Sequence, residues 1–257
     1  MTARTVALDG ARLHVEVDGP TDAPALLLFS GARCTTGMWE PVLPGLVERF
    51  LVIRHDVRGT GRSWAAADAE FGLDRYADDA AAILEHLGVA GVMVWGMAFG
   101  ARVALAFAAR HPERVLALAL FDASLEAPDT DAQRRGAQVA AKRRAELGLR
   151  DPERRPSWFE HEDEETLRKS LAAAYRDPDH RHYAQGVQVP VLIATGDHDP
   201  NLPASRRLQE LIPGAELAVL EAVGHGSVLA RPDLCLEVFL EFVERGGPPG
   251  DSEGGER

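Results

Sequence analysis

The stretch VMVWGMAFGARVALAFAARHPERV, from Val92 to Val115, decides the fold. It begins with an apolar run of buried-strand length, and after Gly100 its apolar side chains recur at helical spacing. Between the two lies GMAFG, residues 96–100, where a strand-turn-helix unit would carry Gly-x-Ser-x-Gly with a nucleophilic serine on a sharp turn. The serine position holds Ala98. The sequence therefore predicts the turn without the oxygen that would attack a substrate.

Short apolar runs and helical patterns alternate on both sides of this stretch. The apolar runs cover residues 24–31, 50–56, 115–124, 190–197 and 215–223, and the helical patterns cover 73–89, 205–212 and 232–245. Residues 5–18 alternate apolar and polar side chains around Asp9-Gly10, which predicts an opening hairpin. Such alternation predicts an α/β protein with a mostly parallel, twisted sheet that helices cover on both faces.

One region interrupts the alternation. Residues 126–188 hold charged helical patterns and no strand-like run, which predicts a helical cap inserted into the α/β core. The core is then made of two parts, residues 1–125 and 189–245. The tail, residues 246–257, is acidic and rich in Gly and Pro, which predicts disorder.

Composition limits the classes of partner. The chain has 257 residues and a net charge of −12, which argues against binding to nucleic acid or to an anionic membrane. Its two cysteines, Cys34 and Cys235, are far apart and lack metal-ligand spacing, which indicates reduced thiols. The first residues contain no apolar signal segment, and no apolar run approaches the roughly 18 residues of a membrane span. We expect a cytoplasmic protein.

Residues that could carry out chemistry follow four of the predicted strands. Ser30-Gly31 ends the apolar run 24–31, and the GMAFG turn follows the apolar run that begins at Val92. Asp199 follows the run 190–197, and His225 follows the run 215–223. The catalytic residues of a Ser-Asp-His triad can follow one another along a chain in this same order: the serine turn, then the acid, then the histidine. The segment HDVRGTGRS, residues 55–63, adds a further motif in sequence order.

Together these segments resemble the α/β-hydrolase superfamily, and most closely its small bacterial branch of enol-lactonases, esterases and C–C bond hydrolases. The resemblance extends from Thr5 to about Glu244. It implies the α/β-hydrolase fold, a helical cap and an active site that needs neither a metal nor an organic cofactor. It also implies a small-molecule substrate that bears a carbonyl group.

The resemblance implies a role for each matching residue. His225 would be the general base, Asp199 would orient it, and Ala98 would occupy the nucleophile position without a nucleophile. The backbone N–H groups of Phe99 and Ala32 would form the oxyanion hole. Asp122, which ends the strand after the turn, is the alternative to Asp199 as the acid.

Six further residues are candidates for the lining of the substrate pocket: Ser30, Gly31, Cys34, Met97, Trp158 and Tyr175. Cys34 could also replace the missing nucleophile, although the sequence indicates no base close to it.

Three functions remain open at this stage. The first is an enzyme whose His/Asp dyad acts without covalent catalysis, by hydrolysis or by lyase, isomerase or cyclase chemistry on an ester, lactone or ketone. The second is a Ser→Ala variant of a conventional serine hydrolase of esters, lactones or C–C bonds. The third is a non-catalytic pseudoenzyme that binds a ligand. The retention of Asp199 and His225 favours an enzyme over the third function, and the sequence names neither the substrate nor the oligomeric state.

Overall fold

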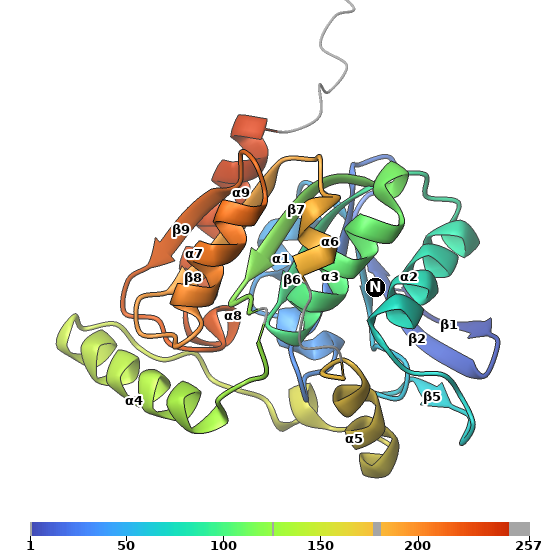
Figure 1. Ribbon diagram of the computed structural model, residues 1–257, viewed down its shortest axis with the longest axis horizontal. Helices are drawn as coiled ribbons and strands as arrows, with labels where there is room; N and C mark the ends of the chain where they lie inside the picture. Colours follow the sequence, from blue (N-terminus) through green and yellow to red (C-terminus); the bar gives the residue numbers. More distant parts are fainter. Residues whose placement is uncertain (1, 125, 177–180, 247–257) are drawn as a thin grey trace, which may run out of the picture.

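A computed structural model describes residues 2–124, 126–176 and 181–246 of the chain (Figure 1). The predicted disordered tail lies outside these residues except for Gly246, which ends the last helix.

Within the described residues, nine strands form a single sheet. They are β1 (Thr2–Leu8), β2 (Ala11–Asp18), β3 (Ala25–Phe29), β4 (Leu51–His55), β5 (Trp64–Ala65), β6 (Val92–Met97), β7 (Val115–Phe121), β8 (Val191–Gly196) and β9 (Glu216–Leu220). The order across the sheet is β1-β2-β4-β3-β6-β7-β8-β9, with β5 paired to β2. All pairings from β4 to β9 are parallel, and only those made by β2 are antiparallel. The predicted fold class is confirmed.

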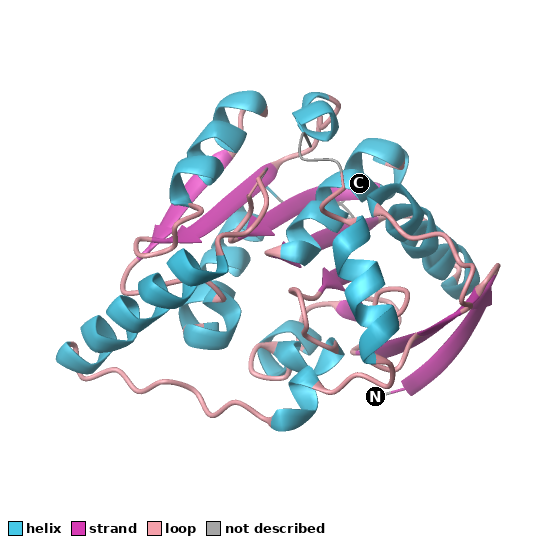
Figure 2. Cartoon of the chain, turned by 60° about the horizontal axis from the view of Figure 1, so that its bottom comes forward, coloured by secondary structure: helices cyan, strands magenta, loops and turns pink. Residues whose placement is uncertain are grey.

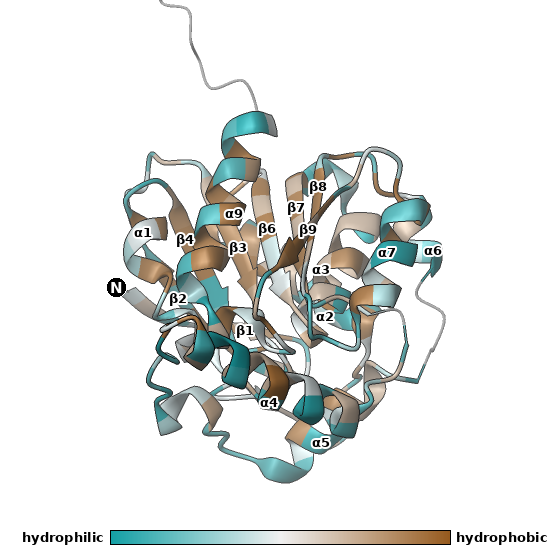
Figure 3. Ribbon diagram, turned by 90° about the vertical axis from the view of Figure 1, so that its left-hand side faces the viewer, coloured by the Kyte–Doolittle hydropathy of each residue, from teal (hydrophilic) through white to brown (hydrophobic). Residues whose placement is uncertain are grey.

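Helices cover both faces of the sheet (Figure 3). The helical segments are η1 (Thr36–Trp39), α1 (Leu43–Val47), α2 (Leu73–Leu87), α3 (Phe99–Arg110), η2 (Pro112–Arg114), α4 (Thr130–Glu146), η3 (Pro156–Phe159), α5 (Glu164–Ala173), α6 (Arg181–Gln185), α7 (Leu202–Leu211), α8 (Ser227–Ala230) and α9 (Pro232–Gly246). α2, α3 and α7 contribute to the hydrophobic core on one face, and α1, α8 and α9 contribute to the core on the other.

The apolar runs become the buried strands because both of their faces are covered. Every residue of β3, β6 and β8 is buried, as expected for central parallel strands. α3 approaches the sheet through small side chains such as Ala101, Ala104 and Ala108, all at most 3% exposed. On the opposite face the ring of Trp95 stacks on Phe239 of α9 with centroids 4.5 Å apart. The central strand β6 is thus fixed from both sides.

The described residues between β7 and β8 contain only helices, namely α4, η3, α5 and α6. α4 packs directly on the loops at the carboxyl ends of β8 and β9. A Cβ atom on Gly136 would lie 2.1 Å from the carbonyl oxygen of His198, and one on Gly224 would lie 2.7 Å from the Cα of Ala137. Figure 2 turns this edge of the sheet toward the viewer and shows helices in front of the strands. α6, in contrast, contacts α3 and α7.

Candidate active site

Ala98 joins β6 to α3 in a conformation that residues other than glycine rarely adopt, with φ 53° and ψ −109°. Its N–H donates to the carbonyl oxygen of Phe121 at 2.8 Å. A Cβ on Gly96 would lie 2.4 Å from the Gly100 carbonyl oxygen, and one on Gly100 would lie 2.1 Å from that of Phe29. Both glycines are therefore required where the strand and helix backbones meet. The turn is intact, but its central side chain is a methyl group.

His225 lies in the loop between β9 and α8, and Asp199 lies in the loop that follows β8. The Nδ1 atom of His225 is 3.0 Å from Oδ2 of Asp199, while Oδ1 accepts the backbone N–H of Asn201 at 2.9 Å. Burial would by itself lower the pKa of His225, but the hydrogen bond to Asp199 and the charges of Asp122 and Asp199 outweigh it and raise the pKa. Since Nδ1 donates to the carboxylate, Nε2 is left to take up a proton.

A second carboxylate, that of Asp122, lies fully buried beside this pair. Its Oδ2 accepts the backbone N–H groups of Gly226 at 3.0 Å and Ser227 at 2.7 Å, and Oδ1 is buried without a partner among the described residues. Burial, followed by the charge of Asp199, raises the pKa of Asp122 to about 7. Asp122 therefore holds the residues that follow His225, whereas Asp199 bonds to the imidazole itself.

The two backbone N–H groups predicted as oxyanion donors, those of Phe99 and Ala32, have no acceptor among the described residues. Phe99 is the first residue of α3, where N–H groups lack intrahelical acceptors and the helix dipole favours negative charge. Both residues line the same cavity as Ala98 and His225.

This cavity measures about 90 Å³ and lies between the carboxyl edge of the sheet and the segments that follow β7. Its lining consists of Ala32, Ala98, Phe99, Arg102, Asp122, Ser124, Glu126, Pro128, Thr130, Gln133, Tyr175, Asn201 and His225. Drug-sized ligands occupy sites of about 300–1,000 Å³, so this cavity is sized for a much smaller molecule or for the reacting part of one. Tyr175 is the predicted pocket residue that lies here.

Ser30, which we expected in the pocket, does not line this cavity. Its hydroxyl donates to the carbonyl oxygen of Thr35 and accepts the indole N–H of Trp39, both at 3.1 Å. Because both hydrogen bonds lie inside the protein, Ser30 fixes the loop after β3 and does not face the cavity.

Gly31, Cys34 and Met97 are also absent from the lining. The Gly31 N–H points to the sulfur of Met38 at 3.2 Å, and a Cβ on Gly31 would lie 2.5 Å from Cε of Met97. Cys34 and Met97 are buried in the hydrophobic core on the side of α1 and α9. Burial raises the pKa of the Cys34 thiol to about 12, so it lacks the thiolate that a replacement nucleophile would require.

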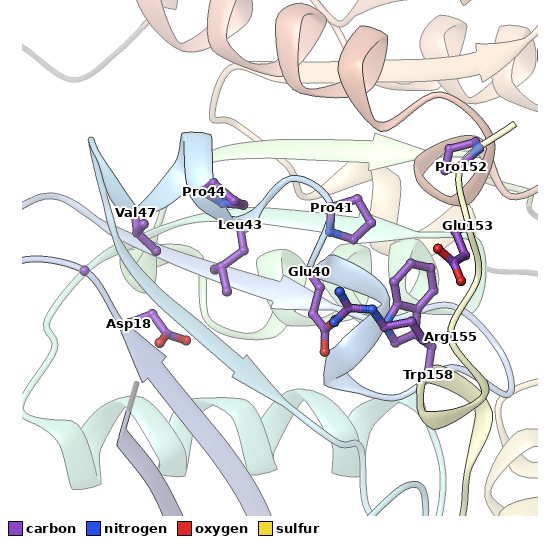
Figure 4. Close-up of a pocket in the computed structure, with 11 residues that line it drawn as sticks. Asp18, Glu40, Pro41, Leu43, Pro44, Val47, Pro152, Glu153, Arg155 and Trp158 are labelled. Carbon is purple, nitrogen blue, oxygen red and sulfur yellow. The ribbon is translucent and has the colours of Figure 1, made fainter. Parts of the chain in front are cut away.

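A much larger cavity, of about 680 Å³, lies between the end of β2, α1 and the segment before η3 (Figure 4). Trp158, which we expected in the substrate pocket, lines this larger cavity instead. The other residues that line the larger cavity are Asp18, Gly19, Glu40, Pro41, Leu43, Pro44, Val47, Pro152, Glu153 and Arg155. None of the predicted catalytic residues is among them.

Asp122, Asp199 and His225 are the described residues that come closest to a metal-binding group, with one ligand atom from each within 4.8 Å of the others. Three of the four carboxylate oxygens already take part in the hydrogen bonds given above. A metal ion bound through Nδ1 of His225 would displace the His225–Asp199 hydrogen bond. The arrangement as it stands is an acid–base pair with an additional buried carboxylate.

Arg102 and Asn201 belong to the cavity although the sequence did not single them out. The amide nitrogen of Asn201 donates to the carbonyl oxygen of Asp122 at 3.1 Å and lies 3.5 Å from Nδ1 of His225. Arg102 is 5% exposed and lies one helical turn after Ala98. The signal for Arg102 was present in the sequence, because it is the single charged residue in the otherwise apolar run FGARVALAFAA, residues 99–109.

No helix in the described ranges is both long enough and apolar enough to cross a membrane.

Comparison with known proteins places the chain in a family. A family model described as the alpha/beta hydrolase fold matches residues 24–152. A putative carbamate hydrolase, RutD, from Variovorax paradoxus is 30% identical, with 93% of this chain and 98% of that protein covered. The 3-oxoadipate enol-lactonase 1 of Acinetobacter baylyi is 23% identical, with 91% of this chain and 94% of that protein covered.

Solved structures support the same assignment. A hydrolase from Pseudomonas aeruginosa superimposes with a TM-score of 0.77 at 25% identity, over 94% of this chain and 98% of that one. The enol-lactonase from Burkholderia xenovorans gives a TM-score of 0.77 at 24% identity, over 94% and 100% of the two chains. With the sheet order, the turn at Ala98 and the positions of Asp199 and His225, these matches show that the chain belongs to the α/β-hydrolase fold family.

Proposed function

We propose that this protein is an enzyme that hydrolyses a small carbonyl compound without a covalent intermediate, with His225 as the general base. One observation carries the proposal: a single small cavity is lined by His225, by the methyl group of Ala98 and by the residues whose N–H groups are available, Phe99 and Ala32. These groups would supply each component of a hydrolytic site except the nucleophilic oxygen.

The chemistry follows from these groups. Nε2 of His225 takes a proton from a water molecule as its oxygen attacks the carbonyl carbon of the substrate. The N–H groups of Phe99 and Ala32 stabilise the negative charge that develops on the carbonyl oxygen. When the tetrahedral intermediate collapses, the leaving group departs with the proton from His225, giving an acid and an alcohol or amine. Asp199 keeps the proton on Nδ1 and stabilises the imidazolium between these steps.

The same groups would also suit abstraction of a proton next to the carbonyl, which is the first step of a lyase, isomerase or cyclase reaction. We favour hydrolysis because relatives that match nearly the full chain are named as a carbamate hydrolase and an enol-lactonase. By this analogy the substrate is a small ester, lactone or carbamate. α4, α5 and the segments that flank them would form the cap, since Pro128, Thr130, Gln133 and Tyr175 line the cavity from that side.

A conventional serine hydrolase with one substitution at Ala98 is the second candidate. The turn favours it, because the backbone at Ala98 keeps the φ of 53° that would present a serine hydroxyl to the cavity. A non-catalytic binding protein is less well supported, because a ligand pocket does not require the hydrogen-bonded pair His225–Asp199.

The test is turnover of a panel of small aryl acetates, lactones, enol-lactones and carbamates by the unchanged chain and by His225→Gln. Loss of a general base costs about 10²- to 10⁴-fold in rate, and we expect a loss in that range. His86→Gln, an exposed histidine on α2, is the matched control and should retain full activity. Panel activity that survives His225→Gln, or a panel without any substrate, would overturn the proposal.

A further inference from the structure

Four arginines are almost completely buried, and they differ in how their charge is compensated. Arg54 and Arg58 are 1% exposed, Arg144 is 4% exposed and Arg102 is 5% exposed. Arg58 forms two hydrogen bonds to Asp79, at 2.7 and 2.8 Å. Arg54 pairs with Asp18 and Glu16, and Arg144 pairs with Asp151.

Arg102 has no such partner. Among the described residues, no carboxylate lies within 4.0 Å of its guanidinium group, and its Nη1 atom is buried without a hydrogen bond. Its guanidinium carbon lies 4.8 Å from the centre of the Tyr175 ring, over its face. A buried, unpaired cation is costly, and such groups are normally paired with an anion. Two of the four arginines line cavities that include His225, Arg102 in the cavity of Ala98 and Arg144 in a neighbouring one of about 230 Å³, and of these two only Arg102 is unpaired.

The position of Arg102 on α3 directs it toward the reacting groups. It lies four residues after Ala98, and its backbone N–H approaches the Ala98 carbonyl oxygen at 3.4 Å. Residues four apart share one face of a helix, and helical side chains lean toward the N-terminus. The rise between Ala98 and Arg102 is about 6 Å, so one small molecule can reach both.

Two acidic residues also line the cavity. The charge of Glu126 favours the Arg102 cation, but neither carboxylate lies within 4.0 Å of the guanidinium group. The carboxylate of Glu126 is 67% exposed and is bonded to Arg207. Oδ2 of Asp122 is occupied by the N–H groups of Gly226 and Ser227. The cation is therefore available to an anion that enters from solution.

We propose that Arg102 binds a carboxylate group of the substrate, and that the substrate is a small ester, lactone or carbamate that carries a carboxylate a few bonds from the reacting carbonyl. The naming of the reacting group rests on the proposed function, whereas the carboxylate site rests on Arg102 alone. A guanidinium presents parallel N–H donors that match a carboxylate, and the ring of Tyr175 lies against the guanidinium group. The volume of about 90 Å³ limits the bound group to a few non-hydrogen atoms.

The test measures binding and does not depend on turnover. Sodium acetate and sodium propionate are titrated into the full chain by calorimetry at constant ionic strength, beside the neutral isosteres acetamide and propionamide. We expect the two carboxylates to bind and the two amides not to bind. Arg102→Gln should weaken carboxylate binding by about 10- to 100-fold, since hydrogen bonds to charged groups are among the stronger ones.

Arg110→Gln is the matched control, because Arg110 lies on the same helix and pairs with Asp78 at the surface. It should leave carboxylate affinity unchanged. Arg102→Lys keeps the charge without the paired donors and should bind carboxylates with intermediate affinity. This variant, together with the comparison of carboxylates and amides on the unchanged chain, decides the matter if Arg102→Gln does not fold.

Three results would overturn the proposal: no binding of either carboxylate, equal binding of carboxylates and amides, or unchanged carboxylate binding in Arg102→Gln. Equal binding of inorganic phosphate would replace the carboxylate site by a general anion site, which also contradicts it. Carboxylate binding together with activity that is independent of His225 would leave this inference standing and refute the proposed function. Activity that depends on His225 together with no carboxylate binding would refute this inference and leave the proposed function standing.

Discussion

Two of the cavities in the described part of the chain differ in size and in chemistry, and His225 lines the smaller of these two. The larger cavity, near Trp158, has about 680 Å³, but its buried Asp18 is bonded to Arg54, and Glu40 is bonded to Arg155. The smaller one, beside Ala98, has about 90 Å³ and collects a hydrogen-bonded His/Asp pair, two free N–H groups and an unpaired buried arginine.

The comparison teaches that an unpaired charge beside a hydrogen-bonded His/Asp pair, more than volume, distinguishes the candidate site. The largest pocket is the usual first hypothesis for a binding site. Here the carboxylates of Asp18 and Glu40 in the larger cavity are paired with arginines, and its unpartnered buried atom is the neutral indole nitrogen of Trp158. The smaller cavity instead contains a charged group without an anion, the guanidinium of Arg102. Groups left unpaired in a buried place are costly, and perturbed acids and bases gather at functional sites.

The largest expected effect comes from restoring the missing oxygen. Ala98→Ser should raise hydrolysis of small aryl esters by up to about 10⁶-fold, because the triad serine accounts for a very large share of the rate in serine hydrolases. The rate should show a burst as an acyl-enzyme accumulates. Steady-state and rapid-mixing assays measure both quantities. If the double variant Ala98→Ser/His225→Gln were as fast as Ala98→Ser, the dyad would not be the base.

Asp199→Asn tests the acid of the pair. It should lower the activity of the unchanged chain by up to about 10⁴-fold, because an amide cannot hold the required tautomer of His225. Asp197→Asn is the control, since this carboxylate on the same loop accepts the N–H groups of Ala222 and Val223 and does not bond to His225. If kcat/KM fell equally in the two variants, the loop and not the acid would be responsible.

The pH profile tests the state of the base. His225 must be neutral to accept a proton, and its pKa is raised above the ordinary value of 6.5. We expect kcat/KM to rise about tenfold per pH unit below that pKa and to level off above it. Asp199→Asn should move the inflection to lower pH, because the hydrogen bond that raises the pKa is lost. A profile that falls as the pH rises through this range would contradict a neutral histidine base.

Gly100→Ala tests the close approach of β3 and α3, next to the turn at Ala98, through stability. Its Cβ would lie 2.1 Å from the Phe29 carbonyl oxygen, and we expect a loss of about 1–3 kcal/mol in the free energy of unfolding from this overpacking. Gly186→Ala, where a Cβ would meet nothing within 4 Å, should be neutral or slightly stabilising. Denaturant unfolding compares the two variants, and equal stabilities would refute the close approach of β3 and α3.

The smallest expected effect lies in the larger cavity. Glu153→Gln should leave kcat/KM within about twofold, because surface substitutions away from a site change free energies by no more than about 0.5 kcal/mol. Steady-state assays with the best panel substrate provide the measurement. A tenfold loss of kcat/KM would indicate that the larger cavity takes part in the reaction, and the distinction between the two cavities would then fail.

The sequence predicted the fold because the signals were local. The apolar runs of the parallel strands and the two glycines around Ala98 define the sheet and the turn without knowledge of distant contacts. Asp199 and His225 could be placed because each follows directly on a strand that ends at the same edge.

The lining of the pocket could not be predicted in the same way. The side chains of Ser30, Cys34 and Met97 face the interior beneath the loop, and Trp158 lies in the other cavity. These directions are set by contacts between segments far apart in the sequence, such as the hydrogen bond from Thr35 N–H to the Trp158 carbonyl oxygen. Arg102 is the opposite case. Its charge inside an apolar helix was visible in the sequence, but only the structure shows that this charge is buried and unpaired.

The measurement that tests the central claim most directly is intact-mass spectrometry of the unchanged chain during turnover of its best panel substrate. If His225 activates water at a site without a nucleophile, the protein keeps its mass while product accumulates, and Ala98→Ser gains the mass of the acyl group under the same conditions. An acyl adduct on the unchanged chain, wherever it maps, would contradict the account.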